Sequence, residues 1–149
     1  MKRCARPLFS PFLHVCAMTF FFACGGSAQP SSPEGASTDG EWVSGVSADG
    51  SYVVKWRVIG GTIPRADPFD VEIRITDAKG NPSDAWCTID AEMPEHGHGM
   101  NVVPQMQRTA EGHFLAKGLL LHMPGRWSIL IDARIGAVTE RTQFLYVMP

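Results

Sequence analysis

The sequence predicts an all-β protein built as one antiparallel sandwich. Three observations support this prediction: apolar and polar residues alternate along several segments after residue 40, turn residues separate those segments at short spacing, and no segment has the periodicity of an amphipathic helix. Together they favour a single immunoglobulin-like antiparallel β-sandwich of about seven strands. The Cys…Trp…Cys pattern of true immunoglobulin domains is absent, so the likeness concerns architecture only.

The clearest strand pattern begins at Phe69. From there to Thr76, large apolar residues occupy every second position and polar residues lie between them, as in a strand with one buried face. Further strands are predicted over residues 51–59, 85–93, 112–121, 126–134 and 139–147. Turns are predicted over residues 77–82, 110–112 and 135–137.

The beginning of the chain predicts an export signal over residues 1–23. Lys2, Arg3 and Arg6 form a basic start, an apolar stretch follows over residues 7–23, and small residues come after it. The stretch is short for a membrane span, which needs about 20 apolar residues. Two cleavage sites are compatible with this signal. One lies before Cys24, which would then bear a lipid, and the other is ordinary signal cleavage after Ala28.

The residues around Cys24 resemble a bacterial lipobox, in which a small residue precedes the cysteine that is acylated. Ala23 fits that pattern, whereas Phe21 stands where the motif prefers leucine. The resemblance implies lipid attachment at Cys24 and a membrane-anchored lipoprotein of the bacterial cell envelope that faces the periplasm. Gly25 after the cysteine resembles the sorting signal for the outer membrane, where the envelope has two membranes.

Residues 24–40 are rich in Gly, Ser and Pro and predict a flexible linker on that lipid anchor. The folded domain is then expected over residues 41–149. After residue 23 the chain has 10 lysines and arginines against 15 aspartates and glutamates, with no basic cluster. This balance argues against nucleic acid as a partner, because binding to phosphates needs a basic face.

Histidine and methionine gather in one stretch of the expected domain. Its centre reads Met93-Pro-Glu-His-Gly-His-Gly-Met100, and His122-Met-Pro124 follows downstream. If residues 96–100 are extended, His96, His98 and Met100 project to one side. Imidazole suits Cu(II) and thioether sulfur selects Cu(I), so the mixture predicts copper as the metal. Met93, His122 or Met123 would complete the shell of ligands.

A structural explanation of the same residues stays open. Met93 and Met123 could fill gaps in the sandwich core, as methionine often does, and His-Gly-His-Gly could be a polar loop. Cys87 is expected to be a small core residue rather than a nucleophile. The sequence has no HExxH, GxSxG or phosphate-loop motif, so an enzyme is not expected.

Several pieces of the chain, in order, resemble the YtkA-like family, which is related to FixH-like proteins. The most specific pieces are Ala91-Glu-Met-Pro-Glu-His-Gly-His-Gly-Met100 and Met123-Pro-Gly-Arg-Trp127, and the resemblance covers about residues 50–147. It implies a small exported or membrane-anchored immunoglobulin-like domain associated with copper handling or oxidase assembly. The residues that carry over are Met93, His98, Met100, Met123, Gly125 and Trp127. A FixH-like protein would keep a transmembrane helix, where this chain has a predicted lipid.

Two functions follow as hypotheses. The first is a copper-binding module that binds or delivers the metal in the envelope and meets a copper-donating or copper-accepting protein there. The second is a non-metal interaction or structural β-sandwich domain without catalytic activity. Burial discriminates them, because Met93 and Met123 packed in the core with a solitary solvent-facing His96 would favour the second hypothesis.

Overall fold

The computed structural model describes residues 39–149, so the predicted signal peptide, Cys24 and most of the predicted linker lie outside the described residues. The described part is all β. Its strands are β1 (Val43–Val46), β2 (Tyr52–Val58), β3 (Phe69–Asp77), β4 (Trp86–Met93), β5 (His98–Gly99), β6 (Gln105–Ala110), β7 (His113–Leu119), β8 (Gly125–Ile135) and β9 (Val138–Met148). Residues 39–149 contain no helix that is long and apolar enough to cross a membrane.

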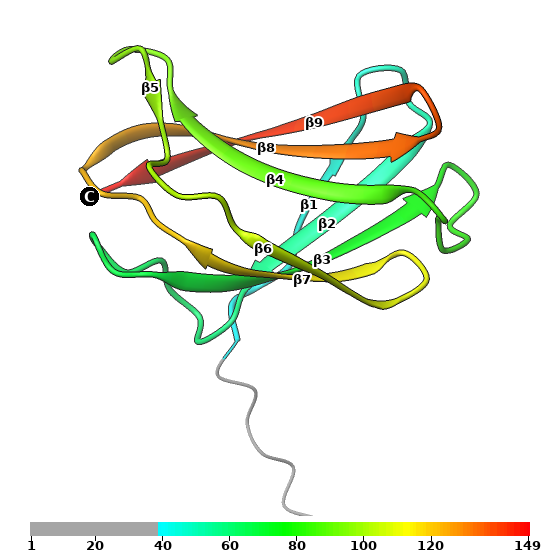
Figure 1. The fold of residues 1–149 in the computed structure, drawn as a ribbon, viewed down its shortest axis with the longest axis horizontal. Coiled ribbons are helices and arrows are strands. Elements are labelled where there is room, and N and C mark those ends of the chain that lie inside the picture. Colours follow the sequence, from blue (N-terminus) through cyan, green and yellow to red (C-terminus); the bar gives the residue numbers. More distant parts are fainter. Residues whose placement is uncertain (1–38) are drawn as a thin grey trace, which may run out of the picture. The chain divides into compact units, whose positions relative to one another are not determined.

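The strands form two antiparallel sheets that face each other as a sandwich (Figure 1). One sheet has five strands in the order β1-β2-β3-β7-β6, and the other has four in the order β5-β4-β8-β9. The predicted all-β sandwich is therefore confirmed. Seven of the strands have six residues or more, and the short β1 and β5 are additional.

Alternation along the strands places the core between the two sheets. In β3 the buried positions are Phe69, Val71, Ile73 and Ile75, as the sequence pattern predicts. Strand β4 alternates in the same way, with Cys87 fully buried. The largest fully buried side chain is Trp127 of β8, which lies at the end of the core nearest the His/Met residues.

The structure differs from the sequence prediction at the edges of the sheets. Strand β6 was not predicted, because Gln-Met-Gln-Arg-Thr-Ala has one large apolar residue and gives no alternating pattern. Strand β7 ends at Leu119 rather than Leu121. Gly118 has a φ of 77°, and its backbone N–H donates to the Asp70 carboxylate at 3.0 Å, so the pairing of β7 with β3 shifts in register there, one residue before the strand ends.

Three connections meet at one end of the sandwich. They are the β2–β3 loop over residues 59–68, the β4–β5 turn over residues 94–97 and the β7–β8 connection over residues 120–124. The first and third are joined, because the Ala66 backbone N–H donates to the Leu121 carbonyl at 3.1 Å. Ala66 has a φ of 57°, a left-handed conformation that costs a residue with a side chain roughly 1–2 kcal/mol. The contact therefore holds a strained backbone beside His122.

Candidate functional site

The first His/Met segment, residues 93–100, is a tight turn followed by a short strand. The backbone N–H groups of His96 and Gly97 both donate to the Met93 carbonyl at 3.0 Å, and Gly97 has a φ of 68°. After Met93, which ends β4, only His98 and Gly99 of this segment are in a strand, where they pair with Met93 and Glu92 respectively. The expectation of an extended chain from residue 96 onward is therefore wrong at its start. His96 is exposed on the turn.

The second His/Met segment, residues 121–127, is a bend fixed by Trp127. That side chain is fully buried, and its Nε1–H donates to the Met123 carbonyl at 3.0 Å. Leu121, at the start of the bend, is also fully buried. Backbone and core contacts thus hold His122 and Met123 from both sides.

The two segments bring three histidines together, although they are separated in sequence. The ring centroids of His98 and His122 are 5.1 Å apart, and those of His96 and His98 are 5.8 Å apart. The Trp127 ring stands edge-on to both inner histidines, 6.1 Å from His98 and 5.5 Å from His122. His98 is therefore the central member of the cluster, and Trp127 forms its apolar wall.

The Nδ1 atom of His122 is buried and has no hydrogen-bond partner among the described residues. A buried polar atom without a partner costs about 1–3 kcal/mol, and a water or an ion bound at the atom removes that cost. Trp56 Nε1 and Thr142 Oγ1 are also buried without a partner in the described part of the chain, but His122 alone of the three belongs to the His/Met cluster. In His98, Nδ1 lies 3.4 Å from the Gly99 carbonyl oxygen. In the tautomer with its proton on Nδ1, this contact is a long hydrogen bond and the Nε2 lone pair is free.

The methionines of the cluster differ in burial. Met93 is 1% exposed and belongs to the core. Its Cε packs so closely on Gly125 that a Cβ added to this glycine would be only 2.7 Å from it. Met100 and Met123 are partly buried and pack against the core from its edge. The hypothesis that these methionines fill the sandwich core therefore fits Met93 best. Met100 and Met123 are partly exposed and lie close to histidines in sequence, two residues after His98 and directly after His122.

The cluster does not form a three-ligand site from histidine, cysteine and carboxylate alone: no such group that could hold a metal is found in residues 39–149. Cys87 is not a substitute, because burial raises the pKa of its thiol to about 12 and the thiolate is the form that binds metals. A metal here would take two imidazoles and complete its shell with thioethers, which suits copper.

A hollow of about 500 Å³ opens beside the first His/Met segment. Its lining includes His98 together with the carboxylates of Asp90 and Glu92 on the outer face of β4. His98 therefore lines a hollow that also holds negatively charged side chains. A cation could approach His98 by this route.

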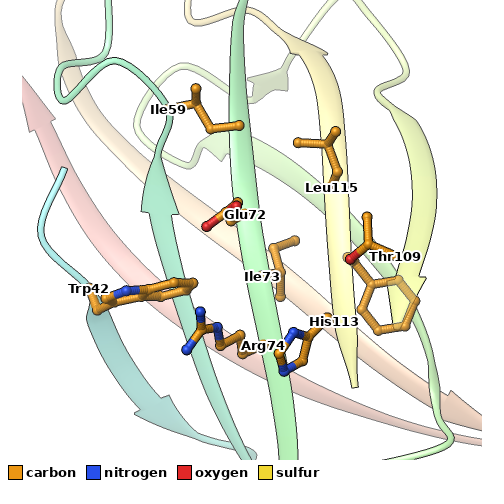
Figure 2. A pocket seen from close by; sticks show the side chains of 9 residues that line it. Trp42, Ile59, Glu72, Ile73, Arg74, Thr109, His113 and Leu115 are labelled. Atoms are coloured by element: carbon orange, nitrogen blue, oxygen red, sulfur yellow. The ribbon is translucent and has the colours of Figure 1, made fainter. Parts of the chain in front are cut away.

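A second hollow, of about 150 Å³, lies on the outer face of the five-stranded sheet (Figure 2). The Trp42 ring forms one wall and is covered by Arg74 and Arg57, whose Cζ atoms lie 4.4 and 4.8 Å from its centroid. Arg57 is held by Asp39 at 3.0 Å and Glu72 at 2.6 Å. Sequence reasoning missed this group, because nothing in the spacing of these residues predicts that they meet.

The same view places His113 in this second hollow, on β7 and next to Arg74 in the sheet register (Figure 2). His113 is thus on a different sheet from the other clustered histidines, although it is close to them in sequence. The sequence prediction left His113 out of the ligand set, and the fold gives the reason for doing so.

The described fold defines a small antiparallel β-sandwich domain with a His/Met cluster at one end. No family model matches the sequence, and no curated protein matches it. Among solved structures, the chain is similar to a DUF4426 family protein from Pseudomonas aeruginosa PAO1, with 16% identity and a TM-score of 0.49 over 70% of this chain and 94% of that one. The fold assignment rests on the strands and registers described above, and the YtkA-like resemblance stays a prediction.

Proposed function

We propose that this protein binds copper in the bacterial cell envelope through the His/Met cluster, as the YtkA-like resemblance implies. The observation that carries the proposal is the buried Nδ1 of His122, which has no partner within residues 39–149 and whose ring lies 5.1 Å from that of His98. A neutral imidazole with an unused lone pair is the form in which histidine binds a metal. The orphaned atom would gain a partner when the metal binds.

In this proposal each residue has a distinct role. His98 and His122 supply the nitrogen ligands, and Met100 and Met123 supply soft sulfur that favours Cu(I). His96 stands at the exposed rim, where it can contact an arriving or departing ion. Met93 forms the floor of the site, and Trp127 shapes its wall. A site with few fixed ligands and an open side suits transfer of copper to another envelope protein.

The proposed location follows from the sequence. The predicted export signal and the lipobox-like residues around Cys24 would place the domain at the membrane surface, facing the periplasm. Palmitate labelling of the full chain tests this part separately. Label should appear in the wild type and be absent from Cys24→Ser, and equal labelling of the two would contradict the anchor.

The alternative is an interaction or structural domain that binds no metal, and one observation favours it. Met93 is a core residue at 1% exposure, so part of the His/Met pattern has a packing explanation. The two hypotheses differ in what His98 and His122 do, because core packing does not explain the close approach of two imidazoles at a solvent-accessible end.

Titration of the full chain with Cu(II) in air, and with Cu(I) anaerobically against a chromophoric chelator, separates the hypotheses. Copper should bind tighter than about 1 μM, which corresponds to roughly −8.2 kcal/mol. Bound Cu(II) should quench the fluorescence of Trp127, whose ring lies 5.5 Å from that of His122. Because loss of a ligand's supporting partner alone costs about 10–100-fold, the double variant His98→Ala/His122→Ala should lose at least ~100-fold.

The matched control is His113→Ala, which removes a half-buried histidine from the other sheet. It should bind copper as the wild type does. Equal affinity of the wild type and the double variant would contradict the proposal, as would absence of saturable binding below micromolar copper. The non-metal hypothesis would then be the one to pursue.

A further inference from the structure

Within residues 39–149, strand β9 is an edge of the four-stranded sheet with no further strand beside it. The strand order puts β9 at the edge, paired with β8 alone among the described strands (Figure 1). Strand β1 of the other sheet approaches the side chains of Thr142 and Phe144 through Gly45. From Gln143 to Met148 no backbone hydrogen bond from another described segment reaches its outer edge; the Ala48 N–H reaches it only at Arg141, at 3.1 Å. A row of free N–H and C=O groups of this kind is a template for a further strand.

The same stretch lacks the features by which proteins usually protect an edge strand. Residues 142–148 read Thr-Gln-Phe-Leu-Tyr-Val-Met, with no charged residue, glycine or proline. Lysines, prolines and bulges are the common protection against edge-to-edge pairing. Strand β9 pairs with β8 in continuous register over its whole length, so no bulge twists the edge away. Arg141 and Pro149 flank the unprotected stretch and lie outside it.

Two of its three outward side chains, Leu145 and Val147, are apolar and exposed, and the third is Gln143. Leu145 is 64% exposed and Val147 is 59% exposed, whereas the alternate residues Thr142, Phe144 and Met148 are buried in the domain. In a strand with its inner face packed, the outer face is normally polar. The free backbone edge and the exposed apolar side chains thus coincide within a few residues.

We propose that β9 pairs antiparallel with β9 of a second copy of this chain, across a two-fold axis at Leu145. The two sheets would then join into one continuous sheet. Centring the pair on Leu145 overlaps the entire uncharged stretch with itself, with Gln143 opposite Val147 of the other copy. Since no like charges meet, self-pairing carries none of the repulsion that would disfavour it in a charged strand. A two-fold axis is also the commonest symmetry of soluble oligomers.

The backbone geometry supports this centre. Because Arg141 points its carbonyl to the outer edge, the alternate residues Gln143, Leu145 and Val147 also point their N–H and C=O groups outward. Leu145 would therefore exchange both hydrogen bonds with its own copy, at a Cα separation of about 5.5 Å. That separation lies within the roughly 4.4–6.8 Å that a disulfide spans.

Cysteine cross-linking of the purified full chain tests the proposal. Leu145→Cys should give a covalent dimer on a non-reducing gel after mild oxidation with diamide. Val138→Cys is the matched control, because Val138 is 61% exposed on the same strand but lies at the other end of it. The dimer fraction should be several-fold higher for Leu145→Cys than for Val138→Cys. The parent chain, which has the buried Cys87 and the three cysteines at positions 4, 16 and 24, gives the background.

Two results would overturn the proposal. Equal cross-linking of the two variants would mean random collision, and a lack of cross-linking by Leu145→Cys above the parent would mean that the edges do not meet. Both readouts are independent of copper, so the outcome does not depend on the function proposed above. Circular dichroism of both variants establishes that they keep the β fold of the parent.

Discussion

The two His/Met segments hold their histidines by different means. In residues 121–127 the chain is fixed from both sides, by the buried Trp127 whose Nε1–H bonds the Met123 carbonyl and by the Ala66 N–H on the Leu121 carbonyl. In residues 93–100 the turn depends on two backbone bonds to the Met93 carbonyl, and His96 faces solvent. One half of the proposed site is therefore built into the core, and the other half is a surface turn.

This difference has a consequence for metal exchange. A ligand that is locked by packing is pre-organised, so binding costs it little conformational entropy. A ligand on a surface turn can move without disturbing the core. In the proposed copper site His122 would be the fixed ligand, and the turn with His96 would be the part that opens to a partner protein.

The largest expected effect on stability comes from removing Trp127, which anchors residues 121–127. Trp127→Ala should lower the free energy of unfolding by about 3–5 kcal/mol, because it empties a fully buried position and removes the bond to the Met123 carbonyl. Urea unfolding measures the loss. Trp86→Ala, which removes a tryptophan that is 39% exposed, is the control and should cost clearly less. Equal losses would contradict the view that residues 121–127 are anchored by Trp127.

An intermediate effect is expected at Met93, where the two segments touch through Gly125. Met93→Ala should cost about 2–4 kcal/mol of unfolding free energy, since it leaves a cavity at a position that is 1% exposed. Met93→Leu keeps the volume and should cost less than about 1.5 kcal/mol. Urea unfolding compares the two variants.

Met93→Leu also separates packing from ligation. If Met93 only forms the floor of the site, copper affinity should stay at the wild-type value, because leucine keeps the shape and lacks only the sulfur. A large loss of Cu(I) affinity with a small loss of stability would contradict this assignment. It would return Met93 to the set of ligands that the sequence predicts.

The fold was predictable from the sequence where a strand is buried on one face. In β3 the alternation of Phe69, Val71, Ile73 and Ile75 gave the strand and its inner face directly. The same reasoning could not find β6 or the two-residue β5, because edge strands with polar composition or minimal length give no periodic signal.

The site was only partly predictable, for a different reason. Spacing alone grouped His96, His98 and Met100, but Gly97 allows a left-handed backbone at 68° and the chain turns there instead of extending. The position of His122 depends on its contact with Trp127 and on the bond between Ala66 and Leu121, which are tertiary contacts that a local pattern does not contain. The separation of His113 onto the other sheet is likewise a property of strand order.

The smallest effect is expected at His96, and it tests the comparison most directly. His96→Ala removes an exposed side chain from a turn held by backbone bonds, so unfolding free energy should change by no more than about 0.5 kcal/mol. Copper affinity should fall less than for His122→Ala, since His122 is pre-organised and has the buried unpartnered nitrogen. Titration of both variants, with His113→Ala beside them, gives the ranking. If His96→Ala weakens copper binding more than His122→Ala does, the surface turn supplies the main ligand and the roles of the two segments are reversed.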